Sequence, residues 1–178
     1  MKRLSLVLLA ALFAHSAWAF ELKSPDVKQG QRMDRAQEYQ GFGCSGGNLS
    51  PALSWRGAPA GTKGYALTVY DPDAPTGSGW WHWVVYDIPA SVHALPGGVG
   101  VHAQLPKGAK EGRNDYGAHA FGGACPPAGD KPHHYIFTVY ALKVDKLEVP
   151  ENASSALIGF MLHANSLGQA KITATYGR

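Results

Sequence analysis

Apolar and polar residues alternate along much of this chain, and a two-residue period is typical of β-strands that bury one face. The strongest alternating runs lie at 65–70, 81–88 and 135–142, and weaker ones lie at 20–28, 52–55 and 171–176. The polar segment 29–37 fits either a further edge strand or irregular structure. The pattern predicts a mainly β fold organised around three strong strands.

One segment departs from this alternation and predicts a helix over 154–170. Its apolar residues recur near helical spacing, from Ala156 to Leu167. Asn152 or Ser154 is placed to cap the first turn, and Gly168 stands where a helix would end. The chain is then expected to finish in the strand at 171–176.

The composition fits a β protein with many turns. Of 178 residues, 22 are Gly and 12 are Pro, which favours a turn-rich β fold over a helical bundle. Three stretches, 39–51, 89–112 and 112–129, are predicted to be loops, and loops this long are usually functional or loosely ordered. The length predicts one domain, covering 20–178.

The first 19 residues predict a secretory signal peptide rather than part of the fold. Lys2 and Arg3 precede an apolar stretch at 4–13, which is too short to span a bilayer, and Ala17-Trp18-Ala19 matches the small-x-small cleavage pattern. No cysteine follows the cleavage point to carry a lipid, and no later run reaches transmembrane length. We expect an exported protein without a transmembrane anchor, periplasmic or secreted.

Export also changes the charge. The formal net charge of +3 falls to +1 once Lys2 and Arg3 are removed, because no acidic residue leaves with them. The chain has no cluster of Lys or Arg, so nucleic acid is not an expected partner.

Cys44 and Cys125 are the two cysteines of the chain. In an oxidising compartment an even pair predicts a disulfide, and one closing a loop of roughly 80 residues is worth about 4 kcal/mol in the chain-entropy model. Two free thiols or two metal ligands are the alternatives.

The candidate chemistry lies at the ends of the three strong strands. Asp71 continues the face of Tyr65, Leu67 and Val69, in a turn that Pro72 and Pro75 restrain. His82 opens the second strand, in phase with Val84 and Tyr86 by simple alternation, and His133 and Tyr135 open the third. If the strands are neighbours, these side chains surround one cleft, with walls from Trp80, Trp81 and Trp83.

Two imidazoles and a phenol in one cleft are hydrogen-bond donors suited to a small oxyanion such as phosphate, sulfate or a carboxylate. Asp71 would orient a histidine rather than touch the anion. The plainer alternative is a set of polar groups at a sheet end that bond to one another.

These residues also carry a family resemblance. Asp-Pro-Asp-Ala-Pro at 71–75, Trp-His-Trp at 81–83 and Gly-Asp-Lys-Pro-His-His-Tyr-Ile-Phe at 129–137 resemble, in order and spacing, the two signature regions of the phosphatidylethanolamine-binding protein family. The resemblance covers essentially all of the chain after the signal peptide. It is greatest to the bacterial, Raf-kinase-inhibitor-like branch and its exported type.

The resemblance implies a central antiparallel sheet, a second smaller sheet packed on it, and few helices. It implies a pocket for phosphate-like or carboxylate anions, including phospholipid headgroups and phosphorylated side chains, and no cofactor. The ligand-binding residues would be Asp71, His82, His133 and Tyr135, and the rim residues would be Asp73, Pro75, Trp81, Gly122 and Gly123. Family members often have Arg where this chain has His134. The sequence leaves open whether the protein forms a homodimer.

Two enzyme functions are alternatives to anion binding. Residues 43–47 fit G-x-S-x-G around Ser45, but a nucleophile elbow needs a strand before it and a helix after it, and the flanking residues are polar or end in Pro51. Asp71, His82 and His133 could instead form a three-ligand metal site of a hydrolase, although no compact ligand motif accompanies them.

A third alternative is inhibition by surface contact. The family resemblance includes inhibitors of kinases and of serine proteases, so an exported protease or host protein is a further candidate partner. No reactive-site loop is visible in the sequence, and this function stays secondary.

Overall fold

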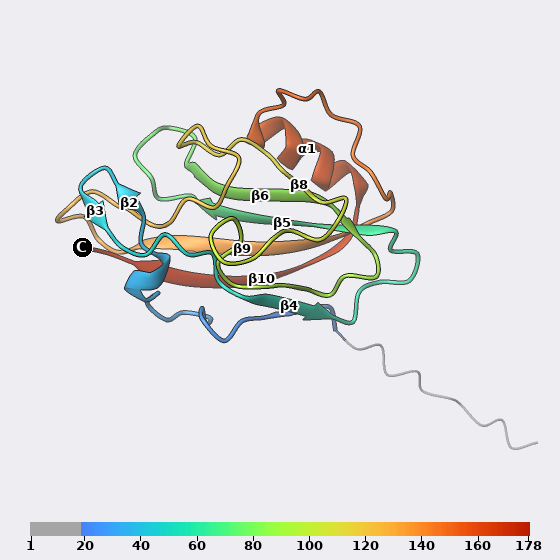
Figure 1. Ribbon diagram of the computed structural model, residues 1–178, viewed down its shortest axis with the longest axis horizontal. Helices are drawn as coiled ribbons and strands as arrows, with labels where there is room; N and C mark the ends of the chain where they lie inside the picture. The colour runs from blue at the N-terminus through green and yellow to red at the C-terminus, as the bar shows by residue number, and fades with distance from the viewer. Residues whose placement is uncertain (1–18) are drawn as a thin grey trace, which may run out of the picture.

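Five antiparallel strands form the central sheet of the computed structural model, which describes residues 19–178. Across the sheet they are β10 (Ser166–Tyr176), β9 (His133–Leu142), β5 (Gly64–Asp71), β6 (Trp80–Pro89) and β8 (Lys110–Glu111). Figure 1 shows the four long strands running side by side. The three strong strands predicted from the alternation are thus adjacent. The predicted signal peptide falls on residues 1–19 and so lies almost entirely outside the described part.

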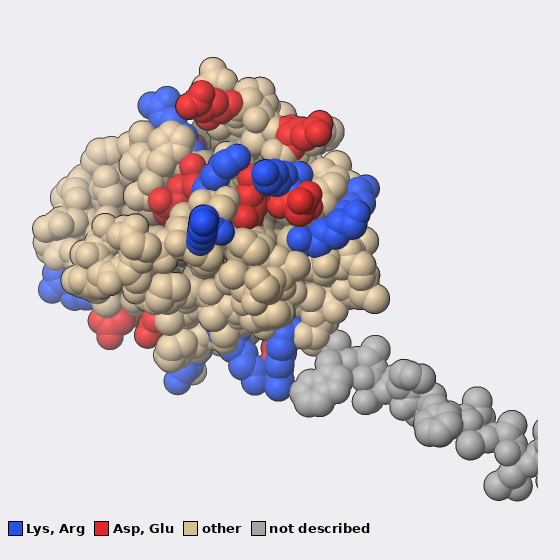
Figure 2. Space-filling view, turned by 45° about the vertical axis from the view of Figure 1, so that its right-hand side comes forward, with Lys and Arg blue, Asp and Glu red and all other residues tan. Residues whose placement is uncertain are grey.

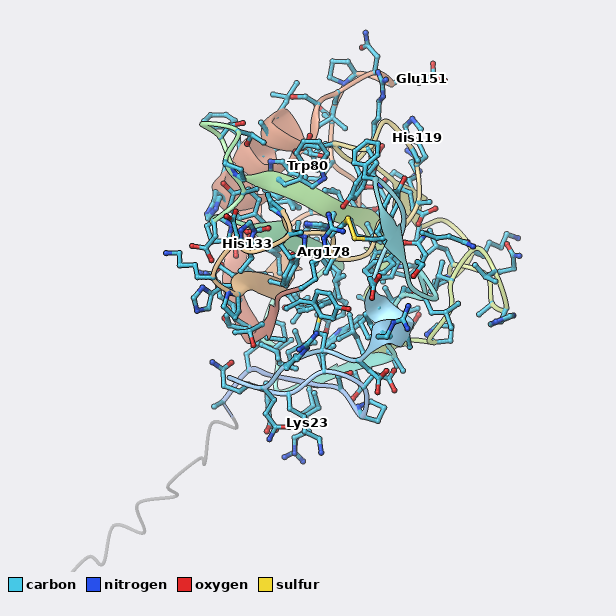
Figure 3. The ribbon with its side chains drawn as sticks, turned by 90° about the vertical axis from the view of Figure 1, so that its left-hand side faces the viewer. Lys23, Trp80, His119, His133, Glu151 and Arg178 are labelled. Atoms are coloured by element: carbon cyan, nitrogen blue, oxygen red, sulfur yellow. A yellow bond between two sulfur atoms is a disulfide. The ribbon has the colours of Figure 1, made fainter. Side chains whose placement is uncertain are left out.

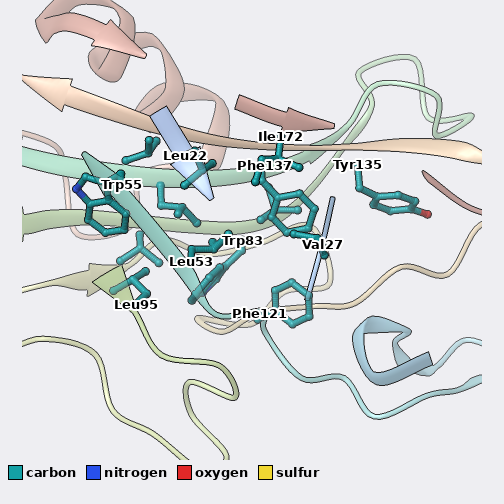
Figure 4. Packing of buried hydrophobic residues seen from close by; sticks show 14 of the residues in the cluster. Leu22, Val27, Leu53, Trp55, Trp83, Leu95, Phe121, Tyr135, Phe137 and Ile172 are labelled. Atoms are coloured by element: carbon teal, nitrogen blue, oxygen red, sulfur yellow. The ribbon is translucent and has the colours of Figure 1, made fainter. Parts of the chain in front are cut away.

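A second, smaller sheet packs on one face of the central sheet. It contains β1 (Glu21–Lys23), β4 (Leu53–Arg56) and β7 (Ala94–Leu95), in the order β1-β4-β7. Leu53 and Trp55 of β4 lie in one buried cluster with Val69 and Phe137 of the central sheet (Figure 4). The predicted pair of packed antiparallel sheets is therefore confirmed.

The helix α1 (Ser155–Asn165) covers the opposite face, where Ile158 and Leu162 pack on Val84 and Tyr140. Its first turn is capped by Ser154, whose hydroxyl accepts from the Leu157 amide. The sequence predicted a helix over 154–170, which is too long. Residues 166–170 belong to β10, which pairs with β9 along its whole length. In residues 166–170 the hydrogen bonds that β10 makes to the backbone groups of β9 outweigh the helix propensity of the segment. Gly168 lies at an irregularity of the strand and not at a helix end.

Loops at one end of the sheet hold three short elements. They are the 3₁₀ turn η1 (Arg35–Gln37), β2 (Gln40–Gly41) and β3 (Cys44–Ser45). The predicted disulfide is present: Cys44 and Cys125 are joined, with Cα atoms 6.0 Å apart across 81 positions of sequence. The Arg178 guanidinium donates to the carbonyls of Pro126 and Gly43, and so ties both cysteine-bearing loops to the chain terminus.

The surface carries mixed charge. On the face drawn in Figure 2, Lys and Arg side chains lie among Asp and Glu rather than gathering into a basic patch. Within residues 19–178, no helix has the length and apolar character needed to cross a membrane.

Candidate functional site

Asp71 ends β5 and organises the turn that follows. Its Oδ1 accepts hydrogen bonds from the amides of Asp73 and Ala74, at 2.8 and 3.1 Å. This is the turn that an Asp side chain makes with the backbone two residues on. Its Oδ2 lies 2.8 Å from Nδ1 of His133. The carboxylate of Asp71 is thus engaged on both oxygens, by backbone and by a neighbouring strand.

His82 reaches the same cleft through a β-bulge. Val69 pairs with Trp83 and Tyr70 pairs with Trp81, so His82 is an extra residue on β6 with no partner on β5. A bulge turns a side chain from the face that simple alternation would give it. The expected phase with Val84 and Tyr86 is therefore wrong, since both of those pack under α1.

His133 and Tyr135 extend β9 past the end of its pairing with β5, which stops at Tyr70 and Ile136. This overhang places both side chains beside Asp71 and the bulge. The rings of His82 and Tyr135 meet edge to face with centroids 5.1 Å apart. In Figure 4 the Tyr135 ring lies at the margin of the core cluster, with its hydroxyl pointing away from the other labelled side chains.

Together these side chains line a cavity of about 150 Å³. Of the predicted site residues, the cavity is lined by Asp71, Pro75, His82, His133 and Tyr135. Figure 3 faces this end of the molecule, with His133 to the left of Arg178, Trp80 above it and the disulfide beside it. The four predicted ligand-binding residues are thus brought together around one hollow.

The predicted rim residues lie less uniformly. Asp73 accepts from the backbone amide and Nδ1 of His134, at 2.8 and 2.7 Å, beside the cavity rather than in its wall. Burial is the largest single influence on the pKa of Asp73 and acts to raise it, but these bonds and the nearby charges together hold the pKa below its ordinary value. Gly122 and Gly123 stand behind His82, to which their carbonyls are bonded.

Trp81 was expected at the rim and lies on the other face of the sheet. Its ring packs at 4.7 Å from that of Tyr70 and next to Gly159 of α1. Trp83 is fully buried in the core, against Phe121. The bulge explains the position of Trp83, which shares the face of His82, while Trp81 keeps the opposite face that alternation gives it. Among the three tryptophans Trp80 is the one that lines the cavity.

One side of the cavity is aromatic, which the sequence did not predict. Tyr116 stacks on Tyr39 with ring centroids 3.9 Å apart, and Phe42, 71% exposed, lies against the same ring at 5.5 Å. The backbone pairing of Asp115 with Trp81 carries Tyr116 over the cleft. Only the Gly-rich character of 112–129 hinted at this, since sequence spacing does not show where a long loop folds back.

Three buried polar atoms in this cavity have no hydrogen-bond partner within residues 19–178. They are Nε1 of Trp80, Nε2 of His82 and the hydroxyl oxygen of Tyr135. Buried polar atoms are nearly always paired, and leaving one unpaired costs about 1–3 kcal/mol. Three such atoms around one hollow indicate a place for a polar group from outside the chain.

Burial also sets the charge states of these groups. It lowers the pKa of His82, although the Gly122 carbonyl and the Asp71 carboxylate act in the opposite direction. Burial raises the pKa of Tyr135, and the negative charge of Asp71 raises it further. At neutral pH the cavity therefore presents a neutral imidazole and a protonated phenol.

The described residues do not form the arrangements that the two enzyme alternatives require. Ser45 lies in the short strand β3 with its hydroxyl bonded to Arg35 at 2.9 Å, outside the cavity wall, and a loop rather than a helix follows it. Residues 19–178 contain no group of three or more His, Cys, Asp or Glu side chains placed to hold a metal ion.

Comparison with known proteins agrees with this architecture. The model of the family described as "Phosphatidylethanolamine-binding protein" matches residues 23–177. The chain is 54% identical to the UPF0098 protein YbcL of Escherichia coli over 97% of this chain and 95% of that protein, and 46% identical to YbhB of the same organism over 88% and 99%. The crystal structure of E. coli YbcL superposes with a TM-score of 0.86 at 55% identity, covering 89% of this chain and 98% of the other. The chain therefore belongs to the phosphatidylethanolamine-binding protein family.

Proposed function

We propose that this protein is an exported binding protein whose pocket holds a small oxyanion, phosphate-like or carboxylate. The observation that carries the proposal is the convergence of the unpartnered Trp80 Nε1, His82 Nε2 and Tyr135 hydroxyl on one cavity. A small oxyanion can accept hydrogen bonds from the two donors among them, Trp80 Nε1 and the Tyr135 hydroxyl. Asp71 acts through His133, because both of its oxygens already accept hydrogen bonds from the protein.

The size of the cavity supports a small group. At about 150 Å³ it lies below the range of about 300–1,000 Å³ typical of pockets for drug-sized ligands. An anionic head fits inside, and any larger substituent would extend past Phe42 and Pro75 at the mouth.

The side chains in the cavity wall suit binding without catalysis. The Thr76 hydroxyl, which lines the cavity, donates to the Gly79 carbonyl, and the Cys125 sulfur is held in the disulfide. The raised pKa of Tyr135 keeps its phenol protonated, which suits a hydrogen-bond donor better than a nucleophile.

Export is part of the proposal. The disulfide between Cys44 and Cys125 is of the kind that persists in oxidising compartments, and the first 19 residues have the pattern of a secretory signal. We place the mature protein in the periplasm or outside the cell.

Isothermal titration calorimetry with phosphoethanolamine, inorganic phosphate and acetate tests this function. Saturable binding of at least one of them is expected, and His82→Ala should abolish it while His119→Ala, at an exposed histidine, should not. Absence of binding heat for the wild-type protein with all three anions would contradict the proposal.

A further inference from the structure

The His82 ring is held in one tautomer by the backbone. Its Nδ1 lies 2.8 Å from the carbonyl oxygen of Gly122 and 3.1 Å from that of Gly123. Carbonyl oxygens only accept hydrogen bonds, so Nδ1 must carry a proton in every charge state. In the neutral ring Nε2 then has a lone pair, and it is this atom that is buried and unpartnered, on a ring that lines the cavity.

The surroundings favour the neutral ring. Its side chain is 2% exposed, and desolvation disfavours the imidazolium more than its neighbours favour it. The titratable groups around it are Asp71, Asp115, Tyr116, His133 and Tyr135. Asp71 and Asp115 favour the charged ring, but the first is bonded to His133 and the second to the Trp81 amide.

The free atoms of the cavity therefore differ in kind. Trp80 Nε1 can only donate, the Tyr135 hydroxyl can donate, and His82 Nε2 accepts. A fully deprotonated anion satisfies the two donors and places its own lone pairs against the lone pair of Nε2. An anion that keeps one hydroxyl group satisfies all three atoms.

Building on the proposed anion pocket, we propose that the ligand is a phosphomonoester bound as its monoanion, with the P–OH group donating to His82 Nε2. The remaining phosphate oxygens accept from Tyr135 and Trp80. A phosphodiester, such as the headgroup region of an intact phospholipid, has no P–OH to donate. A sulfate ester has the same shape as the phosphate and no proton at neutral pH. The site thus selects a phosphorylated small molecule or side chain over a phospholipid surface.

Three probes with the same amine test this selectivity: phosphoethanolamine, its sulfate-ester analogue 2-aminoethyl hydrogen sulfate, and the diester glycerophosphoethanolamine. Titrations are run at about pH 6, near the second pKa of a phosphomonoester. We expect phosphoethanolamine to bind at least about tenfold more tightly than either other probe, the effect of one lost hydrogen bond to a charged group. Equal affinity for the phosphate and sulfate esters, or tighter binding of the diester, would overturn this inference and leave the anion pocket standing. No heat with any probe, nor with phosphate or acetate, would overturn both.

Proton uptake gives a second, independent measurement on the wild-type protein. At about pH 7.5 phosphoethanolamine is mainly a dianion, so binding as the monoanion should take up close to one proton, seen as a dependence of the heat on buffer ionisation enthalpy. At about pH 5.5 most of the ester is already the monoanion, and the uptake should fall to about a quarter of a proton. Uptake of a full proton at both pH values would mean that His82 itself is protonated on binding, and would contradict the proposal.

His82→Gln tests the role of the acceptor. The Gln amide nitrogen can occupy the place of Nε2 and donates, so the preference for the phosphate over the sulfate ester should fall to about one. His119→Gln is the matched control, because His119 also bonds a backbone carbonyl through Nδ1, at 2.8 Å from Glu111, but is exposed and outside the cavity. A preference that survives in His82→Gln would contradict the inference.

Discussion

Nδ1 of His133 lies 2.8 Å from Oδ2 of Asp71, with both side chains almost completely buried. The Nδ1–H group of the imidazole donates to the carboxylate, which fixes the tautomer and the ring orientation. The second nitrogen, Nε2, faces Asp130 at 3.7 Å, beyond hydrogen-bonding distance. Asp71 therefore couples the end of β5 to the start of β9, where two of the cavity residues stand.

Replacing Asp71 by Asn should disturb its pairing with His133, although the Asp and Asn side chains have nearly the same size. Asn can still accept from the Asp73 and Ala74 amides, but its NH₂ group then faces Nδ1 of His133, which must release its proton. We expect the free energy of unfolding to fall by about 1–3 kcal/mol. Nitrogen chemical shifts of His133 should report the proton on Nε2 instead of Nδ1.

Asp73→Asn is the control for that change. Asp73 bonds His134, which is about half exposed, so water compensates for much of the lost interaction and the loss of stability should stay below about 1 kcal/mol. Equal destabilisation by the two substitutions would contradict the role given to Asp71.

His82 should make stability depend on pH. Its pKa in the folded protein is lowered from 6.5 by burial, so between that lowered value and 6.5 the unfolded chain binds a proton that the folded chain does not. Stability should therefore be fully present above pH 6.5 and decrease as the pH falls through this window. Urea unfolding from about pH 8 to about pH 5 should show a smaller decrease in His82→Gln than in the wild type or in His119→Gln. Identical slopes in all three proteins would refute a neutral, buried His82.

The disulfide should contribute strongly to stability and should be fully formed in protein purified from its own compartment. For the loop that it closes, the chain-entropy model gives about 4–5 kcal/mol, so Cys44→Ala with Cys125→Ala should lower the unfolding free energy by up to that amount. Under non-reducing conditions the intact mass should be about 2 Da below that of the dithiol. A mass equal to the dithiol for protein from its own compartment would contradict the pairing.

Much of this architecture could be predicted from the sequence because alternation reports burial directly. The runs at 65–70, 81–88 and 135–142 became β5, β6 and β9 with ends shifted by one or two residues. The end of the helix could not be predicted, since the apolar residues after Asn165 fit a helix face as well as a strand, and the choice depends on pairing with β9.

The residues of the site could be predicted, but the face assigned to His82 was wrong. Simple alternation placed His82 on the face of Val84, and only the β-bulge turns it into the cavity. A bulge leaves no mark in the periodicity of a short strand. Trp81 was placed at the rim by the family resemblance, whereas alternation alone sets it on the face opposite His82, where the structure has it. The aromatic wall at Tyr116 depends on a loop that folds back over β6, which residue spacing does not encode.

A matched pair of tyrosine variants gives the sharpest test of the proposed anion pocket. Tyr135 and Tyr140 both lie on β9, but Tyr135 lines the cavity with an unpartnered hydroxyl and Tyr140 packs under α1. Calorimetric titration with phosphoethanolamine should give single-site binding for the wild type and for Tyr140→Phe, and an affinity lower by about ten- to a hundredfold for Tyr135→Phe. Because the lost hydroxyl has no protein partner, Tyr135→Phe should be as stable as the wild type or more so. Unchanged affinity in Tyr135→Phe would contradict the proposed pocket.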